Sequence, residues 1–168
     1  MKPRRANRPP ARYRKRRGLA ITGLYLLLGP LAGAAGGALA FSLIAAANAL
    51  IDGRAGQIGL LLSGGLTATF LVALPIAYGI GLPSSLLTGL VVALDDRKAR
   101  GVSWSAALLG AGIAWSLTAV LTVLVVPPDG QALWLAGLLA AHLMAATACT
   151  LAARRMFATQ VAPEKPGH

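Results

Sequence analysis

The sequence is poor in acidic residues, cysteine and aromatic residues, and its charges leave long gaps. Only 5 of the 168 residues are Asp or Glu, against 16 Lys or Arg, and 12% are charged overall. Four runs have no charged residue: 18–51, 55–94, 101–128 and 130–153, with 34, 40, 28 and 24 residues. A soluble domain places charge along the polar face of its helices or strands. The gaps therefore exclude an ordinary soluble globular protein, and the 56% hydrophobic content excludes a disordered one.

The residues that carry chemistry are equally scarce. A single cysteine, Cys149, excludes an intramolecular disulfide and a site with several thiolates. All five acidic residues lie outside these four runs. The sequence therefore lacks the membrane-embedded carboxylate on which an ion-coupled transporter usually depends. No catalytic dyad, phosphate-binding loop or metal-ligand spacing is present in the sequence. We therefore predict a protein that is not an enzyme, with no catalytic residues, no metal site and no cofactor.

The long apolar runs predict an all-α integral membrane protein. About 20 apolar residues are needed for one helix to cross the hydrocarbon core. The runs are continuously apolar rather than alternating, which favours helices over a β-barrel. We predict four transmembrane helices in a compact bundle, within a domain of residues 18–153, with spans at about 19–47, 58–80, 103–126 and 131–153.

A further short helical segment is predicted at 83–94, after the second helix. Its 12 residues make about 18 Å of helix, too short to cross. Ser84, Ser85 and Thr88 fall on one side and leucines on the other. Three interpretations fit this pattern: a kinked extension of the second helix, an interfacial helix, or a re-entrant half-helix that lines a binding site or pathway.

The ends of the chain predict the orientation. Residues 1–17 hold nine of the basic residues, three prolines and no acid, which predicts a disordered cytoplasmic tail. The three predicted loops hold one, three and no Lys or Arg, and the tail at 154–168 is again basic. This alternation places both termini in the cytoplasm of a bacterial inner membrane. A cleaved signal peptide is not expected, because the first apolar run is too long for one.

The basic N-terminal tail also indicates a partner. We expect Arg12, Arg14, Lys15, Arg16 and Arg17 to contact anionic lipid headgroups, at about 1 kcal/mol per basic residue near the surface. A nucleic-acid partner is not favoured, because Tyr13 is the only aromatic residue in the tail.

Small residues recur at helical spacing in every span. Gly29, Gly33 and Gly37 form a glycine zipper on one face of the first helix. Gly65, Gly110 and Gly137 mark similar faces on the other helices. Such faces let helices approach closely in lipid. They indicate either contacts within the chain or a seam between copies or partners.

His142 is the one imidazole inside a predicted span. It lies eleven residues from the outer end of the fourth helix, and Trp115 lies equally far from the outer end of the third, so we expect them at similar depth. One interpretation is a neutral histidine bonded to a backbone carbonyl or to Ser116 or Thr118. The other is a gating or proton-sensing residue, since imidazole titrates near neutral pH.

These observations favour a non-enzymatic accessory or scaffold subunit that binds itself or another membrane protein through its glycine-rich faces. The alternative is a small transporter or channel, with a pathway near residues 84–89 and His142.

Overall fold

The structure, a computed structural model, describes residues 11–99 and 101–157 and consists of four long helices. These are α1 (Ala11–Ile51), α2 (Ile58–Ala99), α3 (Trp104–Val125) and α4 (Pro128–Phe157), with one short 3-10 turn, η1 (Ala55–Gln57). No strand occurs in these residues. Five segments are long and apolar enough to cross a membrane: Lys15–Ile51, Ala55–Val72, Leu74–Arg97, Trp104–Val125 and Pro128–Phe157.

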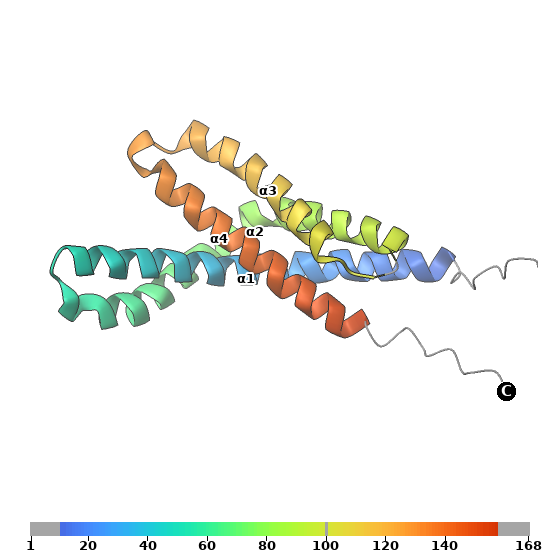
Figure 1. Cartoon of the computed structure of the whole chain (residues 1–168), viewed down its shortest axis with the longest axis horizontal. Helices are drawn as coiled ribbons and strands as arrows, with labels where there is room; N and C mark the ends of the chain where they lie inside the picture. Colours follow the sequence, from blue (N-terminus) through green and yellow to red (C-terminus); the bar gives the residue numbers. More distant parts are fainter. Residues whose placement is uncertain (1–10, 100, 158–168) are drawn as a thin grey trace, which may run out of the picture.

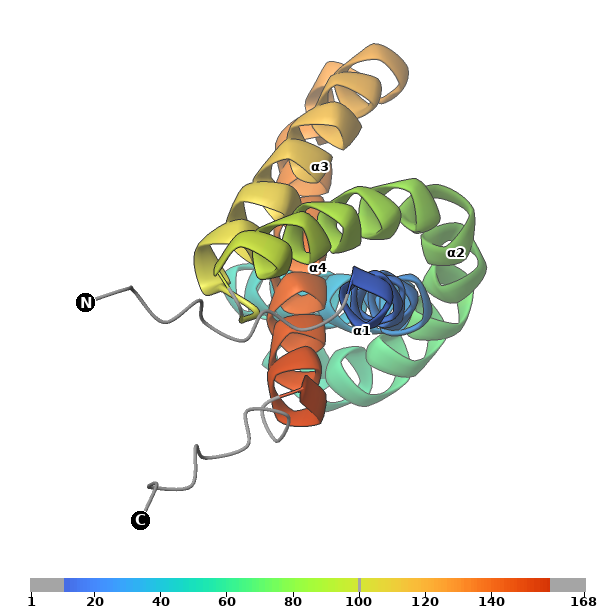
Figure 2. The same ribbon diagram turned by 90° about the vertical axis from the view of Figure 1, so that its right-hand side faces the viewer.

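The helices form two antiparallel hairpins, α1–α2 and α3–α4. Figure 1 shows α1 as a long rod with α2 returning along it, and α4 crossing α1 near the middle of the molecule. The two hairpin tips lie apart, whereas the start of α1 and the end of α4 lie at the same end (Figures 1 and 2). The two hairpins therefore pack against each other at one end of the molecule, which we call the joined end, and they separate at the other end.

α2 is longer than the sequence predicted. It runs without a break through Pro75 and Pro83, so the segment 83–94 is an extension of the second helix and not a separate one. At 42 residues it is about 63 Å long, roughly twice the hydrocarbon thickness. Pro83 lies in the helix interior, where a proline removes one backbone hydrogen bond and bends the helix without ending it. Figure 2 shows α2 curving around α1.

α1 also exceeds its prediction at the N-terminal side. The helix begins at Ala11, so residues 11–17, predicted as part of a disordered tail, are helical. Pro9 and Pro10 precede this point, and the following residues are mostly arginine and lysine, which are good helix formers. Residues 1–10 lie outside the described residues. α4 likewise continues past 153 to Phe157, and 158–168 of the predicted C-terminal tail lie outside the described residues.

In each hairpin turn, hydrogen bonds to carbonyls at the end of the first helix close that helix. α1 ends at Ile51, and Gly53 just beyond it has a φ of 71°, the left-handed conformation that favours glycine. Arg54 N–H then donates to the Ala49 carbonyl at 2.7 Å, and Gly53 N–H to that of Leu50 at 3.1 Å, which closes the helix. In the other hairpin, the Gln131 amide donates to the last carbonyls of α3, Val123 and Val126, at 3.1 and 2.8 Å. α3 begins and ends within one residue of its prediction.

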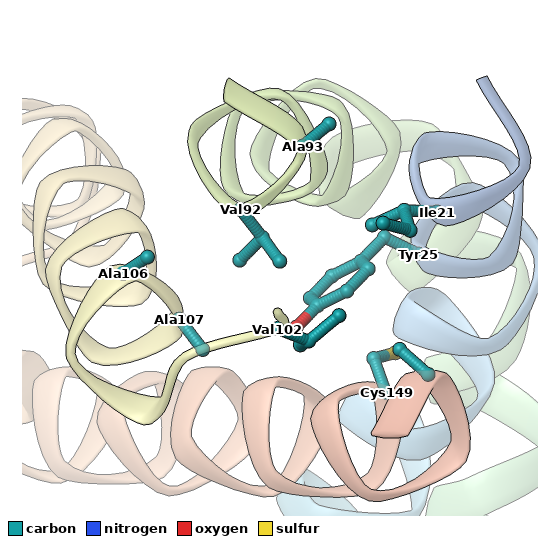
Figure 3. Packing of buried hydrophobic residues seen from close by; sticks show 9 residues of the cluster. Ile21, Tyr25, Val92, Ala93, Val102, Ala106, Ala107 and Cys149 are labelled. Carbon is teal, nitrogen blue, oxygen red and sulfur yellow. The ribbon is translucent and has the colours of Figure 1, made fainter. Parts of the chain in front are cut away.

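The core lies where all four helices meet, at the joined end. Tyr25 points into its centre (Figure 3). Its hydroxyl is 2.7 Å from that of Thr150 on α4. All four helices contribute to this cluster, together with Val102 in the segment before α3. Its members are Ile21, Tyr25, Val92, Ala93, Val102, Ala106, Ala107, Cys149 and Ala153.

Candidate functional site: a polar ring at the basic end

Charged residues gather at the joined end of the molecule, which we call the basic end. It carries Lys15, Arg16 and Arg17 from α1, Asp95, Asp96 and Arg97 from α2, and Arg154 and Arg155 from α4. Both described acids at this end have a partner inside the protein, and the contacts connect neighbouring helices.

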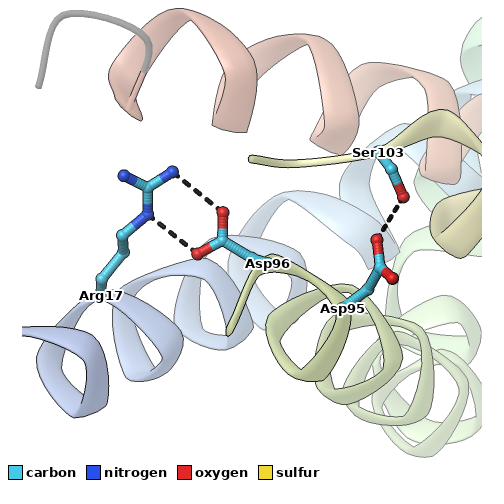
Figure 4. A network of polar contacts seen from close by, with 4 residues as sticks. All are labelled: Arg17, Asp95, Asp96 and Ser103. Carbon is cyan, nitrogen blue, oxygen red and sulfur yellow. Dashed lines mark hydrogen bonds and ion pairs between the residues drawn. The ribbon is translucent and has the colours of Figure 1, made fainter. Parts of the chain in front are cut away.

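Arg17 and Asp96 join α1 to α2. The Arg17 guanidinium donates two hydrogen bonds to the Asp96 carboxylate, both 2.9 Å long (Figure 4). Asp96 is only 7% exposed and the Arg17 side chain 16%, so water screens the pair weakly. The planar fork of arginine matches a carboxylate in this two-point geometry, which makes it stronger than a single contact.

Asp95 and Ser103 join α2 to the start of α3. The Ser103 hydroxyl donates to Asp95 Oδ2 at 2.5 Å (Figure 4). It also accepts from the backbone N–H of Ala106 at 3.2 Å. Ser103 thus caps α3 and at the same time donates its hydroxyl proton to Asp95 of α2. An N-cap serine satisfies one of the backbone donors that a helix start leaves without a partner.

Two arginine–aromatic contacts complete the connections. The Arg154 guanidinium on α4 lies 5.9 Å from the ring centre of Trp104 on α3. Arg17 lies 5.6 Å from the ring of Phe157, which ends α4. Both distances are in the range of cation–π attraction. Together with the two carboxylate contacts, they link α1 to α2, α2 to α3, α3 to α4 and α4 to α1. We call this set the polar ring.

The predicted packing glycines contact other helices of the same chain. A Cβ atom added at Gly29 would overlap the Ser85 hydroxyl and lie 3.0 Å from Ser85 Cβ, so α2 sits directly against it. Gly33 and Gly37 face α4, and an added Cβ would lie 3.7 and 3.8 Å from atoms of Ala141. The other three also have a neighbour: Gly65 faces Ser42, Gly110 faces Thr88 and Gly137 faces Phe41.

The polar face predicted on 84–94 is used for packing. Ser85 and Thr88 are buried, at Gly29 of α1 and Gly110 of α3 respectively, and the Thr88 hydroxyl donates to the Ser84 carbonyl at 2.9 Å. In lipid, a hydroxyl bonded to its own helix carries no unsatisfied donor. These residues therefore fill contacts between helices in the described structure.

His142 is bonded to its own helix. Its Nδ1 is 2.7 Å from the Leu138 carbonyl, which fits the interpretation of a histidine bonded to backbone, and Nε2 is buried without a partner among the described residues. The proposed partners Ser116 and Thr118 bond to carbonyls of α3 instead. The Trp115 indole donates to the Leu135 carbonyl at 3.3 Å. That carbonyl lies seven residues nearer the α3–α4 turn than His142 along α4.

The predicted lipid contacts need one correction. Lys15 and Arg16 are exposed, but Arg17 is turned inward to Asp96 and Phe157. Arg12 and Arg14 lie on the first turns of α1, and their side chains are outside the described residues. The sequence also could not indicate the inward role of Asp96, because 79 residues separate it from Arg17. For Ser103 a signal did exist: a serine just before an apolar run is a common helix start.

Chemically, the polar ring can hold four helix ends together and present cations around its outside. Within the described residues, no three His, Cys, Asp or Glu side chains are placed to hold a metal ion. Comparison with known proteins finds no matching family model, no matching curated protein and no matching solved structure.

Proposed function

We propose that this chain is a multi-pass protein of the bacterial inner membrane that acts as a non-enzymatic accessory or scaffold subunit. In this proposal it binds a second copy or another membrane protein, with both termini in the cytoplasm. The observation that carries it is the outer half of the α1–α2 hairpin, residues 43–72, which we call the hairpin arm.

The hairpin arm is apolar but contributes little to the core. None of the residues in Ala55–Val72 whose burial the structure describes is buried. Large apolar side chains are exposed along both of its helices: Leu43, Leu50, Ile51, Leu60, Leu66, Leu71 and Val72. A contiguous apolar surface of this kind in a membrane protein contacts either lipid or another helix.

The internal use of the glycine faces supports placing the partner surface on the arm. Gly29, Gly33 and Gly37 face α2 and α4 of the same chain, so they are not free for a partner in this arrangement. The two acids of the polar ring support a structural role for the basic end, because Asp95 bonds to Ser103 and Asp96 bonds to Arg17.

The test is native mass spectrometry of the full chain extracted with its own lipids. The proposal expects a homo-oligomer or a stoichiometric second protein. A photo-reactive residue at Leu71 on the arm should then cross-link to that partner, giving one product of defined mass. Leu117 on α3 is the matched control, since the two leucines are 63% and 60% exposed. A monomer without a protein partner, with only lipid adducts from both positions, would contradict the proposal.

A second candidate function is a small transporter or channel whose pathway includes His142 and residues 84–89. The observation in its favour is the buried Nε2 of His142, which has no partner among the described residues. A His142→Ala variant and a Ser85→Ala variant should then both change a flux measured in liposomes. Unchanged flux in both, with the fold intact, would remove this candidate.

A further inference from the structure

We propose that the basic end binds anionic phospholipids at three defined points, each formed by one arginine and one leucine. The pairs are Arg16 with Leu19 on α1, Arg97 with Leu94 on α2, and Arg154 with Leu151 on α4. We call them the three Arg–Leu pairs. This inference does not depend on a protein partner, so it and the proposed function can fail separately.

The pairs share one geometry on three separate helices. In each, an exposed arginine lies three residues from an exposed leucine on the same helix, and the leucine is on the side toward the apolar run. The leucines are 64%, 54% and 46% exposed. Residues three apart in a helix are neighbours on one face. Each pair therefore puts an arginine and a leucine on one helix face, with the leucine toward the apolar run, which is the order of a phosphate above an acyl chain. The Arg97 guanidinium also lies near Gly18 of α1, and that of Arg154 lies over Trp104 of α3.

The charge balance favours an anionic ligand. Residues 11–17, 95–99 and 154–157, which form the basic end, contain nine basic and two acidic residues, a net charge of +7. Both carboxylates are engaged internally, Asp96 by Arg17 and Asp95 by Ser103. The opposite end is different, because its described charges are Asp52, Arg54 and Asp129, and Arg54 pairs with Asp52. The attraction for anions is therefore confined to one end.

The distribution of the pairs favours lipid over one compact anion. They lie on α1, α2 and α4, whose ends come together at the same end of the molecule (Figure 1). Trp104, beside Arg154, is a residue type that settles at headgroup depth. A leaflet surrounds the end of a membrane protein and can offer one headgroup to each helix. A single phosphate or a peptide would need the cations on one face.

The experiment compares the association of spin-labelled phosphatidylglycerol and phosphatidylcholine with the full chain in phosphatidylcholine vesicles. At about 1 kcal/mol per basic residue, the wild type should prefer the anionic lipid about fivefold at low salt. A triple variant, Arg16→Gln, Arg97→Gln and Arg154→Gln, should reduce the preference below about twofold, and 1 M NaCl should do the same to the wild type.

Two controls separate this site from other sources of charge. An Arg17→Gln/Asp96→Asn variant keeps the net charge of the basic end and should keep the lipid preference. Arg54→Gln removes a cation at the opposite end and should also leave it unchanged. Inorganic phosphate should compete no better than NaCl of equal ionic strength, because it lacks an acyl chain.

Three outcomes would overturn the proposal. The first is equal association of both lipids with the wild type. The second is a preference that survives in the triple variant, which would place headgroup binding in residues outside the three pairs. The third is loss of the preference on adding a short RNA at constant ionic strength, which would make nucleic acid the better ligand.

Discussion

At the residue scale, glycines on a single helix can have opposite roles. On α3, a Cβ added at Gly110 would lie 3.0 Å from Thr88 Cα, a backbone atom that cannot rotate away. Two residues further on, an added Cβ at Gly112 would meet nothing within 4 Å. Gly110 therefore permits the close approach of α2 and α3, whereas Gly112 faces the outside of the chain.

We predict that Gly110→Ala lowers the free energy of unfolding by about 1–3 kcal/mol, because α2 and α3 must move apart. Gly112→Ala should be neutral or stabilising by up to about 1 kcal/mol, since alanine is the better helix former. Thermal or denaturant unfolding in micelles checks both. An equal effect of the two substitutions would show that the close approach at Gly110 does not matter.

Small residues at helical spacing predict Gly110 and the other glycines as packing positions, because the spacing itself defines a face. Spacing gives no information about which face meets which helix. The pair formed by Arg17 and Asp96 was therefore not predictable, and Arg17 was expected among the lipid contacts. Side chains this far apart in sequence meet only once α1 and α2 have packed against each other along their length.

At the scale of elements, the start of α3 depends on Ser103. Its hydroxyl caps the helix and is held by Asp95, so one side chain serves two elements. Ser103→Ala should lower the free energy of unfolding by about 1–2 kcal/mol, and Ser103→Thr by much less. Ser105→Ala is the control, because Ser105 is exposed and its hydroxyl lies 3.4 Å from that of Ser103. Unfolding in micelles is the measurement; a loss at Ser105 as large as that at Ser103 would argue against the cap.

Two prolines, Pro75 and Pro83, lie inside the curved helix α2. From the sequence, the segment that begins at Pro83 fits a kinked extension of the second helix, an interfacial helix or a re-entrant half-helix, because the preceding span is already long enough to cross the membrane. Local signals could not decide between a break and a bend, since proline is compatible with both. In the structure the helix continues, Gly81 lies near Pro30 of α1, and the Tyr78 hydroxyl donates to the Leu27 carbonyl at 3.2 Å. The bend therefore fits α2 against α1.

Pro83→Ala should straighten α2. Spin labels at Leu62 and Leu90, in a Cys149→Ala background, should move apart toward about 42 Å, the length of 28 residues of straight helix. Pulsed electron paramagnetic resonance measures this distance. A label pair at Leu109 and Leu124 on α3 should not change. If the α2 distance is the same with and without Pro83, the curvature has another cause.

At the scale of the whole molecule, the polar ring is the place where both hairpins are fastened. Asp96→Ala should lower the free energy of unfolding by about 3 kcal/mol, because it leaves a weakly screened guanidinium without its partner. Exchanging the two residues, Arg17→Asp with Asp96→Arg, should recover at least half of that loss. Asp52→Ala removes an acid from the other ion pair, which is 53% exposed, and should cost less than about 1 kcal/mol. Equal losses at Asp96 and Asp52, measured in micelles, would contradict the special role of the ring.

The number of membrane crossings is a separate property of the whole molecule. Five segments are long enough to cross, yet α2 provides two of them within one continuous helix. A helix that does not reverse its direction crosses a bilayer once, however long it is. Its excess length must be taken up by tilt, by its bends, or by reaching beyond the hydrocarbon. We therefore expect four crossings, with both hairpin tips on the outer side and the basic end inside.

Single cysteines in a Cys149→Ala background distinguish four crossings from five. With four, an impermeant maleimide added to intact cells should label Asp52→Cys and Asp129→Cys, whereas Lys15→Cys and Arg155→Cys should react only after permeabilisation. With five crossings, Asp52 would still be outside the cell, whereas Asp129 would be inside and Arg155 outside. The two arrangements thus differ at Asp129 and Arg155 in opposite directions. Labelling of Arg155→Cys in intact cells, together with protection of Asp129→Cys, would mean that α2 turns back within the membrane.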